Sequence, residues 1–133
     1  MRKFNRDYNQ RKALFKSLLQ SLITWGKLTT TLPKAKVIKR LFDKMVSKAQ
    51  DNTLSHRRQL AADLSSHPHA DRLVDIIAPL FTDRKSGFTT MEKVSIRRGD
   101  AVVMATLKLV KDLPVVEAKK EETKKVTKTK KTK

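Results

Sequence analysis

Apolar residues recur three and four positions apart near the start of the chain, which is the spacing of an amphipathic helix. The repeating positions are Leu14, Phe15, Leu18, Leu19, Leu22 and Ile23. Gly26 follows where this pattern stops, and glycine readily adopts the left-handed conformation of a helix C-cap. The pattern therefore predicts a first helix over about residues 9–25, with Trp25 at its end packed in the core.

A second helix is predicted from Pro33, because the missing N–H of proline costs nothing in the first turn of a helix. Its apolar face consists of Ile38, Leu41, Phe42, Met45, Val46 and Ala49. Between the two helices, the Leu28–Thr31 segment is short and rich in β-branched residues. Such a segment is either an edge strand or a linker.

Two more helices are predicted further along the chain. Asn52 or Thr53 is a suitable N-cap for a third helix that runs to Leu64 and ends in the Ser-Ser-His-Pro segment that follows. Apolar residues over 73–81 indicate a fourth helix, in which Pro79 is expected to kink or restart the last turn.

The pattern then changes from helical spacing to rough alternation. Residues 89–96 and 101–110 are rich in β-branched side chains, and the Arg97–Asp100 segment between them has the polar, glycine-containing composition of a hairpin loop. These segments predict an antiparallel pair of strands. The whole pattern predicts an α+β fold, in which about four helices pack with a small mixed or antiparallel sheet that contains a C-terminal β-hairpin.

Length and composition limit the fold to one domain. Of the 133 residues, about the last 20 are a low-complexity Lys/Thr/Glu tail that has little to bury. We therefore expect a domain over residues 1–112, with a basic N-terminal arm at residues 1–10 and a disordered tail at residues 113–133. The absence of cysteine excludes disulfides and thiolate metal sites. The longest apolar run is five residues, so neither a membrane span nor a secretory signal is predicted, and the chain is expected in the cytoplasm.

The net charge indicates that this small domain binds a polyanion. The chain carries a formal net charge of +18, and the 8 Lys and 3 Glu of residues 114–133 leave +13 on the rest. A compact domain with so much charge of one sign repels itself, and phosphates relieve that repulsion. Release of counterions from a nucleic-acid backbone adds a favourable term to binding.

The cations fall into groups that suit phosphate contacts. An irregular arm can order on RNA, a helix start offers free N–H groups, and a loop can project two guanidinium groups. The alternative for each group is an ordinary solvated surface. The expected RNA-binding residues are Arg2, Lys3, Arg6, Arg11, Lys12, Thr30, Lys34, Lys36, Arg40, Arg57, Arg58, Arg97 and Arg98. Lys39, Lys44 and Lys48 add to the charge of the second helix, which has Asp43 as its one acid.

Catalytic chemistry has no support in the sequence. His67 and His69 flank Pro68 in a predicted loop, and His56 stands apart from them, so all three are expected to be exposed histidines rather than metal ligands. The chain has no phosphate-binding glycine loop, nucleophile elbow or paired-carboxylate motif. We therefore predict a protein that is not an enzyme, with no catalytic residue, metal, cofactor or small-molecule substrate.

Three linked motifs resemble those of the bacterial large-subunit ribosomal protein seventeen family. They are Arg11–Leu14 at the first helix, Thr29–Lys36 at the second and Arg97–Ala101 in the hairpin, and the resemblance spans roughly residues 11–110. It implies a non-enzymatic α+β domain that binds large-subunit ribosomal RNA near the peptide exit region and touches neighbouring ribosomal proteins. By position it implies RNA contacts at Arg11, Lys12, Thr30, Lys34, Lys36, Arg97 and Arg98.

The sequence also departs from that family's pattern. The family's Gly-Gly-Tyr-Thr-Arg motif is replaced by Ser-Gly-Phe-Thr-Thr at residues 86–90, so one RNA contact is expected to be missing. The N-terminal arm is shorter than is usual in the family, and Gln10 stands where the family has histidine.

The sequence thus predicts a structural constituent of the large ribosomal subunit, located in the cytoplasm, that braces rRNA through basic patches. The alternative is a nucleoid-associated DNA-binding protein whose second or third helix enters a groove. The turn at residues 50–53 is compatible with such a motif, but the scatter of basic residues over several elements favours irregular RNA.

Overall fold

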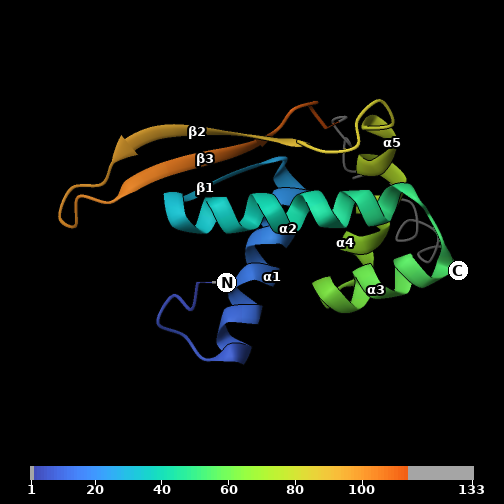
Figure 1. The fold of residues 1–133 in the computed structure, drawn as a ribbon, viewed down its shortest axis with the longest axis horizontal. Helices are drawn as coiled ribbons and strands as arrows, with labels where there is room; N and C mark the ends of the chain where they lie inside the picture. Colours follow the sequence, from blue (N-terminus) through green and yellow to red (C-terminus); the bar gives the residue numbers. More distant parts are fainter. Residues whose placement is uncertain (1, 114–133) are drawn as a thin grey trace, which may run out of the picture.

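A computed structural model of the chain describes residues 2–113. It confirms the predicted α+β class, with helices packed on a small antiparallel sheet (Figure 1). The predicted tail, apart from Leu113, lies outside the described residues. The elements in order are α1 (Tyr8–Trp25), β1 (Lys27–Thr31), α2 (Leu32–Gln50), α3 (Leu54–Leu64), α4 (His67–Arg72), the π-helical turn η1 (Leu73–Ile77), α5 (Ala78–Leu80), β2 (Thr89–Ile96) and β3 (Val103–Leu109).

The sheet has the strand order β1-β3-β2, and both pairs of neighbours are antiparallel. The segment after the first helix is therefore an edge strand rather than a linker. Thr30 pairs with Ala105 and Leu28 with Leu107, so the inner faces of β1 and β3 coincide. Figure 1 shows α2 running along the sheet, with the remaining helices gathered around α2.

The core lies between α2, the sheet and the other helices. From α2 it takes the fully buried Ile38, Phe42 and Val46, as the apolar face of the predicted second helix requires. Phe81 and Phe88 meet edge to face with ring centroids 5.3 Å apart, and both are fully buried. The contact between these two rings packs the end of the helical region against the start of β2.

Two predicted helix ends are confirmed in detail. Gly26 has φ of 69° and its N–H donates to the Leu22 carbonyl at 2.8 Å, which closes the last turn of α1. The Thr53 hydroxyl accepts a hydrogen bond of 3.2 Å from the His56 N–H, so Thr53 is the N-cap of α3.

The fourth helical segment begins earlier than predicted. Helix α4 starts at His67, because Pro68 occupies its first turn, where a missing N–H leaves nothing unpaired. His67 and His69 are therefore helical residues and not loop residues. The path then widens into the π-helical turn, in which the Ala78 N–H donates to the Leu73 carbonyl five residues back. This wider turn precedes Pro79, the residue expected to disturb the helix.

The hairpin projects beyond the helices at one end of the molecule (Figure 1). Strand β2 has its predicted bounds, but β3 begins two residues later than expected. The delay follows from Gly99 and Ala101, whose φ angles of 101° and 50° lie in the left-handed region and extend the turn. The pairing register also shifts between Lys93 and Ser95.

Trp25 is not a core residue, contrary to the prediction. Its side chain is 73% exposed, although α1 buries Phe15, Leu19, Leu22 and Ile23. Two residues of an α-helix turn through about 200°, so Trp25 lies on the face opposite Ile23. No helix within residues 2–113 is long and apolar enough to cross a membrane.

Candidate nucleic-acid interface

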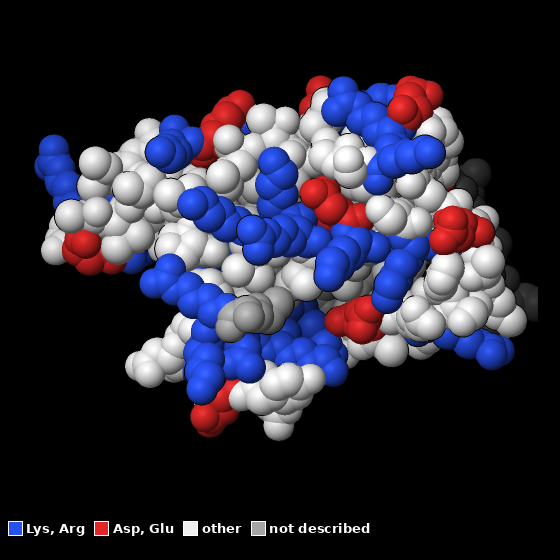
Figure 2. Space-filling view, in the orientation of Figure 1, with Lys and Arg blue, Asp and Glu red and all other residues white. Residues whose placement is uncertain are grey.

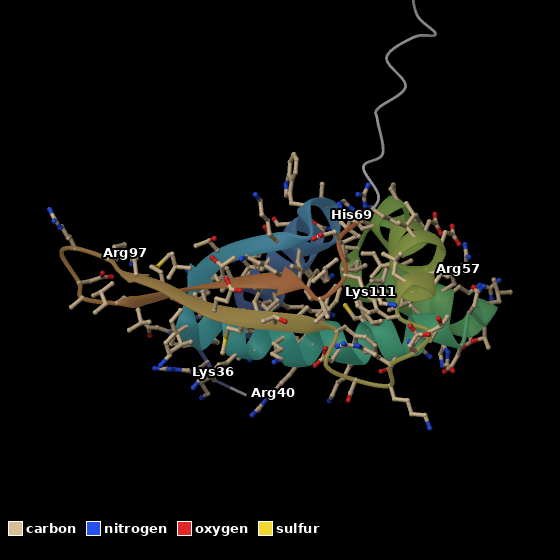
Figure 3. All side chains as sticks on the ribbon, turned by 90° about the horizontal axis from the view of Figure 1, so that it is seen from above. Lys36, Arg40, Arg57, His69, Arg97 and Lys111 are labelled. Carbon is tan, nitrogen blue, oxygen red and sulfur yellow. The ribbon has the colours of Figure 1, made fainter. Side chains whose placement is uncertain are left out.

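Helix α2 carries a row of cations on its outer side, which we call the α2 stripe: Lys36, Arg40 and Lys44. The three residues are four positions apart and exposed, so they share one helix face. Figure 2 shows the basic side chains as a band along α2, and Figure 3 shows Lys36 and Arg40 pointing outward from the helix. Within the described residues, none of the three lies within ion-pair distance of a carboxylate.

The one acid of α2 faces a different partner. The Asp43 carboxylate accepts a hydrogen bond of 3.2 Å from the backbone N–H of Phe88, just before β2. This hydrogen bond links the start of the sheet to the helix. Lys48, further along α2, has its ammonium 3.9 Å from the Asp63 carboxylate of α3, and both side chains remain about half exposed.

The N-terminal arm folds back onto α1 through an aromatic anchor. The Phe4 ring meets the buried Phe15 ring edge to face, with centroids 5.8 Å apart. Phe4 and Asn5 have φ angles of 57° and 51°, which turn the chain at this point. Arg2, Lys3 and Arg6 are exposed, so the anchor holds three predicted RNA contacts near the helical body. The sequence signal for it was a lone phenylalanine in an otherwise polar arm.

A cleft of about 310 Å³ lies between α1 and α2. Apolar and basic side chains both line it. The lining residues are Tyr8, Arg11, Lys12, Phe15, Lys16, Leu19, Leu41, Lys44, Met45, Lys48 and Asp63. Two of the predicted contacts, Arg11 and Lys12, thus stand beside a hollow that the sequence pattern did not reveal, because it forms where two helices separated by β1 meet.

The hairpin tip holds an internal ion pair. The Arg97 guanidinium donates from Nε to Asp100 Oδ1 at 3.1 Å and from Nη2 to Asp100 Oδ2 at 2.5 Å. This hydrogen bonding lowers the pKa of the Asp100 carboxyl and raises the pKa of Arg97. Arg98 is exposed beside the pair, and no carboxylate of the described residues lies within ion-pair distance of it. The Arg97–Asp100 pair therefore shapes the loop, and Arg98 leaves its charge available at the tip.

The Arg57 side chain is also hydrogen-bonded to other residues of the protein. Its guanidinium donates to Asp75 at 2.6 Å, to Asn52 at 3.3 Å and to Asp71 at 3.4 Å. These bonds tie the start of α3 to α4 and the π-helical turn. Arg58, its neighbour, is exposed. Of the two arginines predicted on this helix, only Arg58 has its side chain free of such bonds in the described structure.

Thr30 occupies the inner face of the sheet and is only 8% exposed. This placement does not support an RNA contact by its side chain. The hydroxyl on the outer face belongs to Thr29, which shares a hydrogen bond of 2.8 Å with Thr106 of β3. Alternation of side chains along a strand separates the two threonines, and a strand assignment was needed to see it.

The predicted contacts form an extended surface rather than one site. Figure 3 places Arg97 at one end of the molecule, Lys36 and Arg40 along its middle, and Arg57 near the opposite end. The His69 ring lies within 2.6 Å of the Ser66 hydroxyl. No group of three or more His, Asp or Glu residues within 2–113 is arranged to hold a metal ion.

These features define a small basic α+β protein with cations spread along an elongated face suited to a polyanion. The chain belongs to the family described as Ribosomal protein L17, whose family model matches residues 14–110. It is 40% identical over 109 residues to a large ribosomal subunit protein bL17 from Dictyoglomus thermophilum, covering 82% of this chain and 94% of that protein. The protein of the same name from Heliobacterium modesticaldum is 39% identical over 109 residues, covering 82% and 97% respectively. The expected family resemblance is thereby confirmed.

Proposed function

We propose that this chain braces large-subunit rRNA through its N-terminal arm, the α2 stripe and the hairpin tip. Membership of the family makes it a structural constituent of the large ribosomal subunit, which works in the bacterial cytoplasm. Residues 1–112 are the RNA-binding domain in this proposal. The contacts proposed are Arg2, Lys3, Arg6, Arg11, Lys12, Lys34, Lys36, Arg40, Lys44, Arg58 and Arg98, with Arg97 shaping the tip.

The observation that carries the proposal is the asymmetry of α2. Lys36, Arg40 and Lys44 face outward without acidic partners among the described residues, whereas Asp43 is occupied by the Phe88 N–H. Cations in such a row release counterions when they meet a phosphate backbone, and this release favours binding.

The hairpin supports a second kind of contact. Val94 and Ile96 are 60% and 66% exposed on the projecting part of β2. A two-stranded ribbon that extends beyond the helices is only marginally stable unless something covers it. We propose neighbouring large-subunit proteins, along with rRNA, as the partners of this ribbon. No small-molecule substrate is part of this function.

The DNA-binding alternative gains no support from the fold. On α3, Arg57 is bonded to Asn52, Asp71 and Asp75, and the relatives that this chain matches are named as large ribosomal subunit proteins. The family supports a structural role rather than a catalytic one.

Competition binding tests the proposal. Purified full-length chain is mixed with labelled large-subunit rRNA, and unlabelled duplex DNA or unlabelled rRNA is added at equal phosphate concentration. We expect rRNA to compete at least about tenfold better than DNA, because irregular RNA can meet separated cationic elements at once. Equal competition by the two nucleic acids would contradict the proposal.

A further inference from the structure

We infer that the cleft between α1 and α2 receives one unstacked nucleobase of the bound RNA, with its flanking phosphates on the basic rim. This inference rests on the proposed rRNA binding and adds a base-binding site to it. The cleft shares Lys44 with the α2 stripe but adds a contact to a base, which the stripe alone does not provide. The argument comes from the floor of the cleft, the charge of its rim and the aromatic side chain at its mouth.

The floor is apolar and well packed. Phe15, Leu19 and Met45 line the cleft and are 6%, 3% and 8% exposed, while Leu41 is half-buried. The volume of about 310 Å³ is at the lower end of the range for sites that enclose small flat ligands. An apolar hollow of this size on a protein of such high charge suits a flat, largely apolar group that is tethered to an anion.

The rim supplies the complementary charge. Five cations surround the cleft, namely Arg11, Lys12, Lys16, Lys44 and Lys48, and the one acid among its lining residues, Asp63, is the ion-pair partner of Lys48 at 3.9 Å, so the rim keeps a net positive charge. The Lys16 ammonium donates to the neutral Ser65 hydroxyl, so its charge is not cancelled there. A nucleotide within an RNA strand carries a phosphate on each side of its base, and these cations lie on both walls of the cleft.

The mouth provides a stacking partner. Tyr8 lines the cleft and is 68% exposed, and the Arg11 guanidinium carbon lies 5.8 Å from its ring centroid. Exposed aromatic rings and guanidinium planes are the groups on which proteins stack splayed RNA bases. At the other side, the Asp63 carboxylate can accept a hydrogen bond from an exocyclic amino group of a base.

A protein segment suits this cleft less well. A docked helix would have to present acidic residues to five cations and a narrow apolar row to the floor. Outside the cleft, the exposed apolar residues of α1 and α2 are Ala13 and Trp25, and Trp25 lies at the opposite end of α1 from Tyr8, so they do not prolong the apolar floor into a row. A nucleotide within an RNA strand needs only the hollow for its base, and its two flanking phosphates are the anions that the rim cations bind.

The test compares single-stranded with duplex RNA. Full-length wild-type chain and three variants are titrated into a fluorescent 12-nucleotide oligocytidine, whose bases carry an exocyclic amino group, and a 12-base-pair RNA duplex at one salt concentration. Leu41→Trp fills the cleft while keeping every cation, and Leu54→Trp places the same side chain at a position of α3 that is already 64% exposed. Circular dichroism checks that all three variants are folded.

We expect Leu41→Trp to weaken binding of the single strand by roughly tenfold and to leave duplex binding unchanged, since stacking is lost and the phosphate-binding cations are kept. Leu54→Trp should match the wild type on both probes. Tyr8→Ala, which alters only an exposed side chain, should weaken single-strand binding by roughly fivefold or more.

Each other outcome overturns the inference. Equal single-strand affinities for wild type and Leu41→Trp would show that no base enters the cleft. If Leu41→Trp also fails to stay in large subunits while its RNA affinities are unchanged, a neighbouring protein occupies the cleft instead. Weak binding of both RNAs by the wild-type chain would contradict the proposed function itself, and the base site with it.

Discussion

The carboxylate of Asp43 in α2 accepts a hydrogen bond of 3.2 Å from the backbone N–H of Phe88, just before β2 begins. This bond joins two residues that are 45 positions apart in the chain. It fixes the start of the strand to the helix, while no cation of the α2 stripe forms an ion pair with Asp43 in the structure of residues 2–113. Asp43 therefore contributes to the packing of helix against sheet.

Removing this acceptor should destabilise the fold. Asp43→Ala leaves the partly buried N–H of Phe88 without an acceptor, which costs about 1–3 kcal/mol of unfolding free energy. Asp43→Asn keeps an oxygen that can accept the bond and should lose less than Asp43→Ala. Urea unfolding of the three proteins measures the difference. Identical unfolding midpoints for the wild type and Asp43→Ala would show that the bond contributes nothing.

The α2 stripe should set the salt dependence of RNA binding. Changing Lys36, Arg40 and Lys44 together to Gln should reduce the slope of log affinity against log salt by roughly 0.7–0.9 for each phosphate that is no longer neutralised. The charge-conserving combination Lys36→Arg, Arg40→Lys and Lys44→Arg is the matched control and should keep most of the slope. An unchanged slope in the Gln variant would place the phosphate-binding cations elsewhere.

The hairpin tip should respond to acid through Asp100. Hydrogen bonding from Arg97 lowers the pKa of Asp100 in the folded protein, so the ion pair stabilises the tip above the ordinary pKa of an aspartate. That contribution disappears as the pH falls through the lowered pKa. NMR titration of the carboxyl carbons should show the Asp100 midpoint rising toward the ordinary aspartate value in Arg97→Ala.

Asp83 provides an internal control for that titration. Its pKa is lowered by a hydrogen bond from Lys111, and Figure 3 shows Lys111 well away from Arg97. Its midpoint should be the same in the wild type and in Arg97→Ala. If the Asp100 midpoint also stays the same, the Arg97 pair does not form in solution.

A comparison of Gly26 with Gly87 distinguishes the cost of a left-handed backbone from the cost of steric crowding. Gly26 and Gly87 both have φ near +70°, but a Cβ at Gly26 would lie 3.1 Å from Leu113 whereas the space at Gly87 is open. Gly87→Ala should cost about 1–2 kcal/mol for the left-handed backbone alone. Gly26→Ala should cost more, and shortening Leu113 to Ala in the same chain should remove the excess. Thermal unfolding of the variants measures these costs, and equal costs at the two glycines would mean that Leu113 does not pack against Gly26.

Much of the fold could be predicted because its periodicity is strong. The apolar face of α2 and the alternation of β2 each follow from spacing alone, and Thr53 and Gly26 follow from end-capping rules. The same spacing also places Trp25, which lies two residues and about 200° beyond Ile23, so the prediction of a buried Trp25 did not follow the helical period. The early start of α4 could have been predicted, because proline is favoured in the first turn of a helix and this rule applies to Pro68 as it does to Pro33.

The interface was harder to predict than the fold. A sequence shows which residues are cationic, but it does not show which of them have partners across the structure. Arg57 binds carboxylates 14 and 18 positions away, and Arg97 binds one 3 positions away, so neither is as free as its charge implies. The cleft forms where α1 and α2 pack against each other. A contact between two separate helices leaves no local signal in the sequence.

Sedimentation of cell lysate through a sucrose gradient at high salt tests the central claim most directly. The wild-type chain should comigrate with the large ribosomal subunit in a constant ratio to it, and the Gln variant of the α2 stripe should be depleted from that peak as the salt is raised. Recovery of the wild-type chain among free or chromosomal proteins, with none in the large-subunit peak, would contradict the ribosomal role.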